Sequence, residues 1–257
     1  MHSIWTAATG MQAQQMRIDA IANNLANVNT TSYKKSQVDF QDLLYQAVQA
    51  PGLETAGMQV GLGVRPSAIS KYHAQGNLQV TNNPLDVAID GPGFFRVRSN
   101  DSRVEGGAFT RDGAFKLNDQ GFLVTASGLQ LDPPVQIGNA TEVRIRENGQ
   151  IFGRLQGQGP VVPLGDLPLY LFANPAGLTA LGNNLYSISA ASGPVIGPTP
   201  GGTEGAGKVV QGALEASNVE LVTEMVMMIA TQKAYDTSSK AINVSDKMME
   251  ATNGLIR

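Results

Sequence analysis

Hydrophobic residues recur at every seventh position near both ends of the chain. Close to the start, these positions are Ile4, Met11, Ile18 and Leu25. Close to the end, they are Leu221, Met228, Tyr235, Ile242, Met249 and Ile256. An apolar residue at every seventh position keeps one side of a helix turned toward a partner helix. The pattern therefore predicts two long helices that use these side chains to pack against each other or against other subunits.

The first helix is expected to begin at Ser3, whose hydroxyl suits an N-cap. It should end within residues 23–31, because the Asn and Thr side chains there compete for backbone hydrogen bonds. A shorter amphipathic stretch follows over residues 36–48 and predicts a second helix. Its apolar face would consist of Phe40, Leu43, Leu44 and Val48.

The last helix is expected to open with a capping box, in which Ser217 is followed three residues later by Glu220. Small hydroxyl side chains form a second row beside its large apolar residues, at Thr231, Ser238, Ser245 and Thr252. Small side chains on one face allow two helices to approach closely, so we expect one tightly packed seam. A third row contains Lys233, Lys240 and Lys247. This row is either a solvated face or a charged subunit contact.

Between the helices, residues 61–210 consist of short apolar stretches separated by turn residues, as in a β sandwich or barrel. Asp112-Gly113 and Asn148-Gly149 predict hairpins, because both central residues of a type I′ turn need a positive φ. Leu167–Phe172 predicts a buried strand. Residues 192–207 are rich in Gly, Pro and Thr and predict a linker.

These elements predict an α+β fold, in which paired N- and C-terminal helices form a coiled-coil-like inner domain. A mainly antiparallel, all-β outer domain is inserted between them. The expected organisation is an N-terminal helical segment (1–32), a connecting segment with a short helix and extended chain (33–75), a β-rich domain (76–207) and a C-terminal helical segment (208–257).

Composition narrows the chemistry of the chain. There is no cysteine, which excludes disulfides and thiolate metal sites. A net charge of −3 gives no electrostatic footprint for nucleic acid or for an anionic membrane. The N-terminus lacks the pattern of a cleaved signal peptide, and no apolar run approaches the roughly 20 residues of a membrane span. Taken alone, these signals predict a cytoplasmic protein.

Candidates for catalysis are few. His2 and His73 have no Ser or Asp at a recognised motif spacing. Paired carboxylates could come from Asp86, Asp90, Asp101 and Asp112, although Asp at β turns more often caps the turn. Gly91-Pro92-Gly93 lacks the amide donors and the following helix of a phosphate loop. We therefore expect no enzyme activity, no cofactor and no metal.

Several separate motifs resemble those of bacterial flagellar rod and hook proteins. They are residues 5–11, 23–30, 75–78, 81–89, 91–95, 109–113, 123–125, 212–218 and 231–235. The resemblance covers the whole chain and is greatest to the distal rod members, with the proximal rod as the alternative. Ser32 stands where this family usually has Gly before Tyr33-Lys34, which leaves the conformation of this turn open.

The resemblance implies a subunit of a helical homopolymer, the hollow shaft that transmits torque from motor to hook and carries the export channel. It implies contacts with proximal rod proteins, the hook protein and, in Gram-negative bacteria, the P- and L-ring bushing proteins. It also implies a periplasm-spanning location reached by type III export without a cleaved signal, which replaces the cytoplasmic expectation. Neither nucleic acid nor membrane insertion is implied. From another class, the alternative is a secreted β-rich surface-binding protein that is oligomerised by its helices.

Overall fold

The computed structural model describes residues 2–49, 58–98, 107–138, 140–155, 160–203 and 205–255. The chain forms two compact units. The first, the helical unit, contains Met1–Val28, Lys35–Tyr72 and Val219–Arg257. The second, the β unit, contains Asn29–Lys34 and His73–Asn218. The chain therefore passes between the two units four times.

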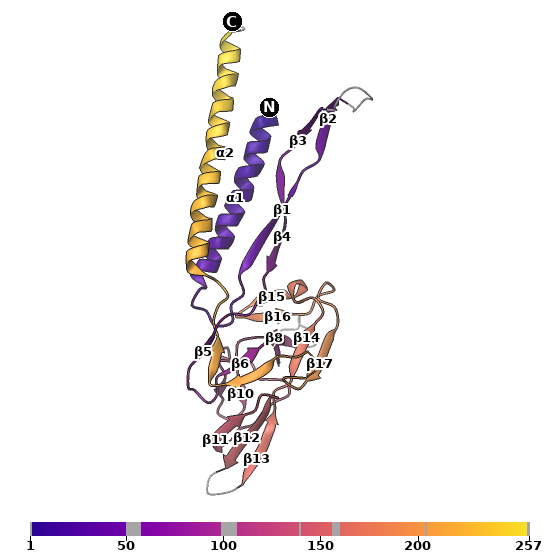
Figure 1. Ribbon diagram of the computed structural model, residues 1–257, viewed down its shortest axis with the longest axis vertical. Coiled ribbons are helices and arrows are strands. Elements are labelled where there is room, and N and C mark those ends of the chain that lie inside the picture. The colour runs from indigo at the N-terminus through magenta and orange to yellow at the C-terminus, as the bar shows by residue number, and fades with distance from the viewer. Residues whose placement is uncertain are drawn as a thin grey trace. The chain divides into compact units, whose positions relative to one another are not determined.

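Two long helices dominate the helical unit, α1 (His2–Ala26) and α2 (Leu221–Leu255). They lie side by side and run antiparallel (Figure 1). Near one end of the pair, the side chain of Asn24 meets that of Glu224. Further along, a Cβ added at Gly10 would lie 3.7 Å from the Ser238 hydroxyl. In both pairs the two residue numbers sum to 248, as expected for two antiparallel helices that keep one register. In this register, residues 247–255 of α2 extend past His2, the first described residue of α1.

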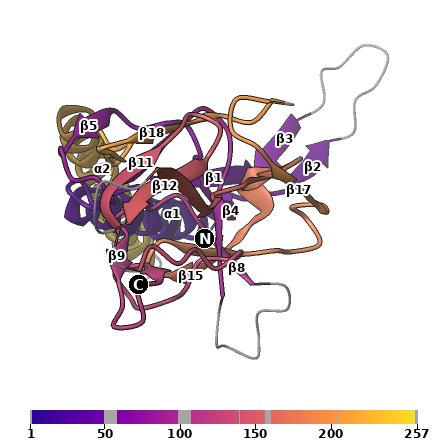
Figure 2. The same ribbon diagram turned by 90° about the horizontal axis from the view of Figure 1, so that it is seen from below.

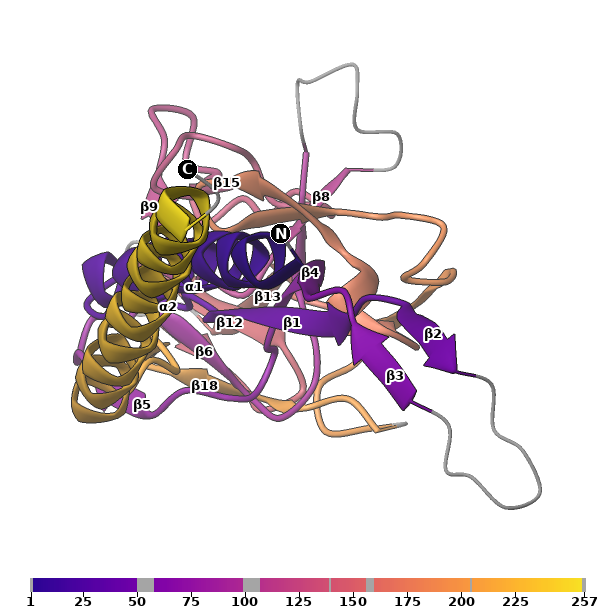
Figure 3. The ribbon, with the colours of Figure 1, turned by 90° about the horizontal axis from the view of Figure 1, so that it is seen from above.

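Two antiparallel strand pairs complete the helical unit. β1 (Ser36–Asp42) pairs with β4 (Val64–Lys71), and β2 (Tyr45–Gln49) pairs with β3 (Met58–Gly61). β1 lies along α1 (Figure 3). Gly63, just before β4, has a φ of 109°, and an added Cβ would collide with the Thr9 hydroxyl of α1. Only glycine fits this close approach without strain.

The prediction of a helix over residues 36–48 is wrong, because β1 and β2 occupy this stretch. In β1, half-buried Ser36, Val38 and Phe40 alternate with exposed residues, which is the period of a strand. Leu44, assigned to the apolar face of the expected helix, is 84% exposed. The backbone pairing with β4 and the packing against α1 decide the conformation here, although the local pattern fits a helix.

The β unit consists of short strands and a 3-10 turn. They are β5 (Leu78–Val80), β6 (Val87–Asp90), β7 (Phe95–Val97), β8 (Ala108–Thr110), β9 (Lys116–Leu117), β10 (Leu123–Val124), β11 (Ala140–Ile145), β12 (Gln150–Leu155), β13 (Val161–Asp166), β14 (Leu169–Phe172), η1 (Pro175–Gly177), β15 (Thr179–Gly182), β16 (Leu185–Ser187), β17 (Val195–Thr199), β18 (Lys208–Gln211) and β19 (Ala213–Glu215). The largest sheet has the order β15-β16-β8-β7, and a second has the order β11-β12-β13. In Figure 2, β11 and β12 are seen side by side. The remaining strands form the pairs β5–β19, β6–β18, β9–β10 and β14–β17.

The core of the β unit is apolar and close-packed. Its main cluster contains Ile89, Phe95, Phe115 and Leu169, and the predicted buried strand over Leu167–Phe172 is confirmed by β14. A second cluster is aromatic, and in it Phe109 meets Phe172 edge to face with ring centroids 4.9 Å apart. Buried aromatic side chains contribute large contact areas, which lets many short strands form one stable unit.

Two hairpins were predicted, and one is confirmed. Asn148-Gly149 joins the antiparallel strands β11 and β12, and Gly149 has a φ of 84°. The prediction of a hairpin at Asp112-Gly113 is wrong, because the flanking strands β8 and β9 do not pair with each other. Instead, β8 pairs with β7 and β16, and β9 pairs with β10. The Asp112 side chain instead caps a local turn by accepting a hydrogen bond from the amide of Ala114 at 3.1 Å.

Three expected boundaries also need correction. Residues 192–207 are not simply a linker, because β17 lies within them and pairs with β14. Residues 208–215 form β18 and β19 and do not begin the C-terminal helix. That helix begins at Leu221, so Ser217 is not its N-cap. At the other end, α1 begins at His2 and therefore includes Ser3. The α+β fold class, with terminal helices and a β-rich region between them, is confirmed.

Candidate assembly surface

One face of α2 lies against the rest of the helical unit. Its residues are partly or fully buried and follow alternating steps of four and three: Glu224, Met228, Thr231, Tyr235, Ser238, Ile242 and Ser245. The most buried are the smaller or polar ones, Thr231 and Glu224. The hydroxyls of Thr231 and Ser238 are satisfied by the carbonyls four residues earlier, at 2.7 and 3.0 Å. Burial of Thr231 and Ser238 therefore leaves neither hydroxyl unpaired.

The residues predicted to pack between helices or subunits occupy different environments. Ile4, Met11, Ile18 and Leu25 on α1 are half-buried, as are Met228, Tyr235 and Ile242 on α2. Leu221 and Met249 are exposed, and Ile256 lies outside the described residues. The role of the whole set in subunit packing stays a prediction.

A second face of α2 carries large apolar side chains in solvent. Val222, Val226 and Ile229 are 66%, 61% and 58% exposed, and Met225 lies beside them. Residues three and four positions apart are neighbours on a helix surface, so these side chains form one continuous apolar stripe. Monomeric soluble proteins rarely expose such a patch unless it binds a partner. We call these four residues the apolar stripe.

The predicted lysine row continues from this stripe. Lys233, Lys240 and Lys247 follow Val226 at seven-residue intervals, which places them on nearly the same side of α2, and all three are exposed. Val244 and Met248, near the end of α2, are also exposed. The lysines therefore share an exposed face with apolar residues and lie away from the buried face of α2.

Asn24 joins three elements of the helical unit. Its side-chain nitrogen donates to the Ser36 carbonyl at 3.0 Å, and its side-chain oxygen accepts from the Ser36 amide at 2.8 Å. The same nitrogen lies 3.3 Å from a carboxylate oxygen of Glu224. The buried amide thus imitates a strand pairing at the start of β1 and ties it to α1 and α2. From sequence, Asn24 was interpreted only as a signal for the end of the helix.

The β unit holds a buried ion cluster that sequence reasoning missed. Glu215 accepts from Lys34 at 2.6 Å and from the Nε of Arg111 at 2.9 Å. The exposed fraction of these side chains is 4% for Arg111 and 0% for the other two. Their positions are far apart in sequence, with separations of 181 and 104 residues from Glu215. No local sequence pattern brings such residues together. The one signal in the sequence is that charged residues are few in this chain, which makes each of them a candidate for a specific role.

Backbone groups complete the cluster. The amide of Gly76 donates to Glu215 at 2.8 Å, Lys34 donates to the Ala74 carbonyl at 2.8 Å, and Arg111 donates to the Gly91 carbonyl at 3.0 Å. Lys34, Ala74 and Glu215 each lie within a few residues of a point where the chain passes between the units. Within the β unit, the cluster therefore holds together the chain segments that continue into the helical unit.

The cluster changes the proton affinity of its members. Burial alone would raise the pKa of Glu215, but the charges of Arg111 and Lys34, with hydrogen bonds from Lys34 and the Gly76 amide, hold the pKa below its ordinary value of 4.5. Burial, together with the charge of Arg111, lowers the pKa of Lys34, and Glu215 offsets this only in part. Glu215 is therefore the charge on which the burial of both cations depends.

Acid should weaken the β unit through Glu215. Because the unfolded chain binds the proton more tightly than the folded protein, the free energy of unfolding falls as the pH drops below about 4.5 toward the folded pKa. Glu215→Gln removes this titration and should flatten the pH dependence in that window. Urea unfolding at a series of pH values from about 3 to 7 measures it. An unchanged slope in the variant would show that other carboxylates dominate.

The structure shows the conformation of the turn at Ser32, which the sequence left open. It has a φ of 55°, the left-handed conformation that favours glycine. Its hydroxyl donates to the Arg111 carbonyl at 2.9 Å, and its amide donates to the Glu215 carbonyl at 2.8 Å. The turn conformation is one that glycine also adopts, and serine adds a hydrogen bond to the segment that carries the ion cluster.

The catalytic candidates do not converge on one another. Asp86 accepts from Thr81 and Asn83, and Asp90 accepts from Gln75, which are local structural roles. His2 is the first residue of α1, His73 packs edge-on against Phe94 and Tyr186, and Asp101 lies outside the described residues. Gly91-Pro92-Gly93 joins β6 to β7 and is followed by a strand.

The described part of the chain has neither a metal-binding cluster nor a membrane-spanning helix. It contains no group of three or more His, Asp or Glu side chains suited to a metal ion. Neither α1 nor α2 offers a stretch that is both long and apolar enough to cross a membrane.

Comparisons with known proteins identify relatives along the whole chain. Residues 4–34 match the family of flagella basal body rod proteins, residues 88–153 match the flagellar hook protein FlgE/F/G D1 domain, and residues 210–255 match the flagellar basal body rod FlgEFG protein C-terminal family. The flagellar basal-body rod protein FlgG of Buchnera aphidicola from Acyrthosiphon pisum is 44% identical over 98% of this chain and 99% of its own length.

Similar proteins are found in other bacteria. FlgG of Borreliella burgdorferi is 41% identical over 100% of this chain and 99% of its own length. The flagellar hook protein FlgE of Treponema pallidum is 39% identical over 64% of this chain, but the match covers only 35% of that protein. The similarity therefore extends over full length to the rod proteins and over a part to the hook protein.

Proposed function

The chain belongs to the flagellar basal-body rod protein family of the FlgG type and is a structural subunit of the distal rod, and we propose that it assembles into a helical homopolymer through the exposed face of α2. The apolar stripe carries this proposal, because burying side chains such as Val226 and Ile229 against a second copy removes apolar surface from water. No catalytic role is proposed.

The register of the helices supports contacts of an open, head-to-tail kind. Residues 247–255 extend beyond the described start of α1, and Met248 and Met249 among them are exposed. An overhanging, partly apolar helix end is available to the next copy, while the apolar stripe lies at the opposite end of α2. Two different surfaces of one subunit that meet in successive copies form a head-to-tail contact, which builds a helical filament when the rotation between copies does not close into a ring.

In this assembly the subunit transmits torque from motor to hook, and the stacked helices form the wall of the export channel. The proposed neighbours are proximal rod proteins, the hook protein and, in Gram-negative bacteria, the P- and L-ring bushing proteins. The proposed location is the rod across the periplasm, reached through type III export without a cleaved signal. The lysine row is proposed to contribute charged subunit contacts beside the apolar stripe.

Amide hydrogen exchange on free subunits and on assembled rods tests the proposal. In the free subunit, residues 247–255 of α2 extend past the described part of α1 and should exchange rapidly, because a one-sided apolar helix gains too little from packing to offset its ordering cost. In rods the same amides should be protected by neighbouring copies. Core strand β6 should be equally protected in both states and serves as the control. Equal exchange of the end of α2 in both states would contradict assembly through this helix.

A further inference from the structure

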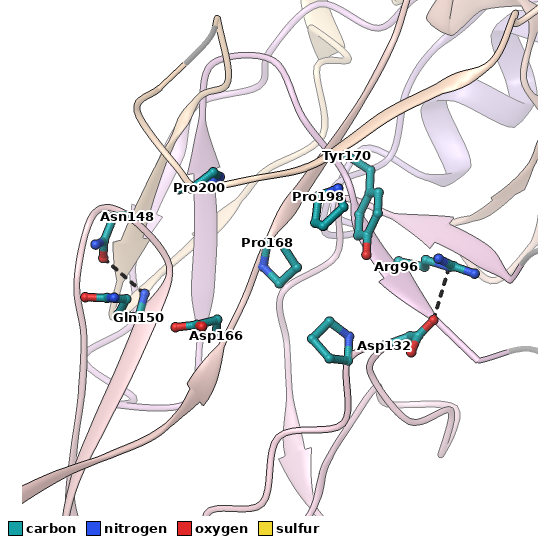
Figure 4. Close-up of a pocket in the computed structure, with 10 residues that line it drawn as sticks. Arg96, Asp132, Asn148, Gln150, Asp166, Pro168, Tyr170, Pro198 and Pro200 are labelled. Carbon is teal, nitrogen blue, oxygen red and sulfur yellow. Dashed lines mark hydrogen bonds and ion pairs between the residues drawn. The ribbon is translucent and has the colours of Figure 1, made fainter.

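The β unit contains a cleft, to which the proposed assembly through α2 assigns no part (Figure 4). Its volume is about 620 Å³, which is within the usual range for small-molecule sites. Four prolines line it: Pro133, Pro168, Pro198 and Pro200. Proline rings are rigid and apolar, and they bring no backbone N–H donor. The prolines therefore provide preformed apolar wall that changes little when a ligand enters.

One flank of the cleft is polar and carries an ion pair, although the buried Nε of Arg96 makes no hydrogen bond. The Nε of Arg96 lies 3.2 Å from the Asp132 carboxylate, and the Arg98 side chain lies 3.7 Å from the other oxygen of that carboxylate. The Tyr170 ring is nearly buried, with the Arg96 guanidinium 5.7 Å from its centre. Its hydroxyl points into the cleft (Figure 4). This flank therefore offers a fixed phenol hydroxyl beside an ion pair of no net charge.

The opposite flank offers both donors and acceptors. Asn148 accepts from the Gln150 amide at 3.1 Å through its side-chain oxygen, so the donor that its side chain can offer a ligand is its nitrogen. Gln150 lies opposite Asp166 in the pairing of β12 with β13, so the backbone ladder holds both side chains at the edge of the cleft. Asp166 is exposed and adds a carboxylate.

The residues that line the cleft determine which class of ligand it can bind. The charged lining side chains, Arg96, Asp132 and Asp166, sum to one negative charge, and Arg98 beside Asp132 brings the total to zero, which favours a neutral ligand over an ion. A simple cation would use only the carboxylates and leave the donors of Asn148, Gln150 and Tyr170 to water, so it would engage only part of this lining. Hydroxyl groups both donate and accept, and so can satisfy all of these groups. A sugar ring presents an apolar C–H face to the proline wall and hydroxyls around its rim. We propose that the cleft binds a short neutral oligosaccharide.

Titration of the ¹⁵N-labelled full chain tests this proposal with two neutral probes, chitotriose and maltotriose, at concentrations up to roughly 10 mM. At least one probe should cause saturable shifts of the amide signals of Asn148, Gln150 and Tyr170. A third arm uses n-butylammonium chloride. If neither trisaccharide shifts these signals, or if only the ammonium ion does, the proposal is overturned.

Variants test whether the trisaccharide binds in this cleft. Gln150→Ala should weaken trisaccharide binding about tenfold, since one good hydrogen bond corresponds to about this factor. Asp166→Asn keeps the size and hydrogen-bonding capacity of the side chain and should bind within about threefold of the native chain, whereas a cation site would lose affinity. Asp119→Ala, at an exposed turn of the same unit, is the matched control. Unchanged binding by Gln150→Ala, with native signals elsewhere, would overturn the assignment to this cleft.

Discussion

Glu215→Ala should destabilise the β unit by about 3–5 kcal/mol, because it leaves two buried cations without their carboxylate. Lys34 and Arg111 would then lie close together in the same buried site, and neither has enough exposure for water to replace the lost partner. Urea unfolding, followed through amide signals of core residues such as Ile89, measures the change in the free energy of unfolding.

The matched control is Glu142→Ala. Glu142 also contacts two arginines, at 2.7 Å and 3.8 Å, but on the exposed face of the β11-β12-β13 sheet. Exposed ion pairs contribute little to stability, so the unfolding midpoint of this variant should be unchanged. A loss of less than about 1 kcal/mol in Glu215→Ala would mean that the cluster behaves as a surface ion pair.

Ile229→Asp should abolish rod assembly while leaving the free subunit folded. The side chain is 58% exposed in the single chain, so a charge there is solvated before assembly and buried without a partner after it. Burial of an unpaired carboxylate costs several kcal/mol, enough to reduce association by more than about a thousandfold. Sedimentation of purified subunits and electron microscopy of rods measure assembly, and circular dichroism checks the fold.

Two further variants make this result specific. Gln120→Asp adds the same charge at an exposed polar position of the β unit, away from α2, and should still assemble. Ile242→Asp lies on the half-buried face and should also stop assembly while leaving the β unit folded, but with a loss of helix packing already in the free subunit. Normal rods from Ile229→Asp would refute the assembly role of the apolar stripe.

The failure over residues 36–48 shows how sequence patterns mislead in short segments. Phe40, Leu43 and Leu44 fit one face of a helix, while Val38 and Phe40 fit one face of a strand, and a window this short satisfies both periods. The pairing of β1 with β4 decides between them. Similarly, Asp112-Gly113 has the composition of a hairpin turn, but β8 pairs with β7 and β16 and not with β9.

The sequence alone determined the two terminal helices, the β-rich region between them and the family, because helix periodicity and turn chemistry act over a few neighbouring residues. The Asn148-Gly149 hairpin and the core strand at Leu167–Phe172 belong to this local class. Only the tertiary structure decided which face of α2 is covered and which remains exposed, since both faces carry apolar side chains. It also brought Lys34, Arg111 and Glu215 together, because a buried ion cluster forms from long-range contacts that no local spacing encodes.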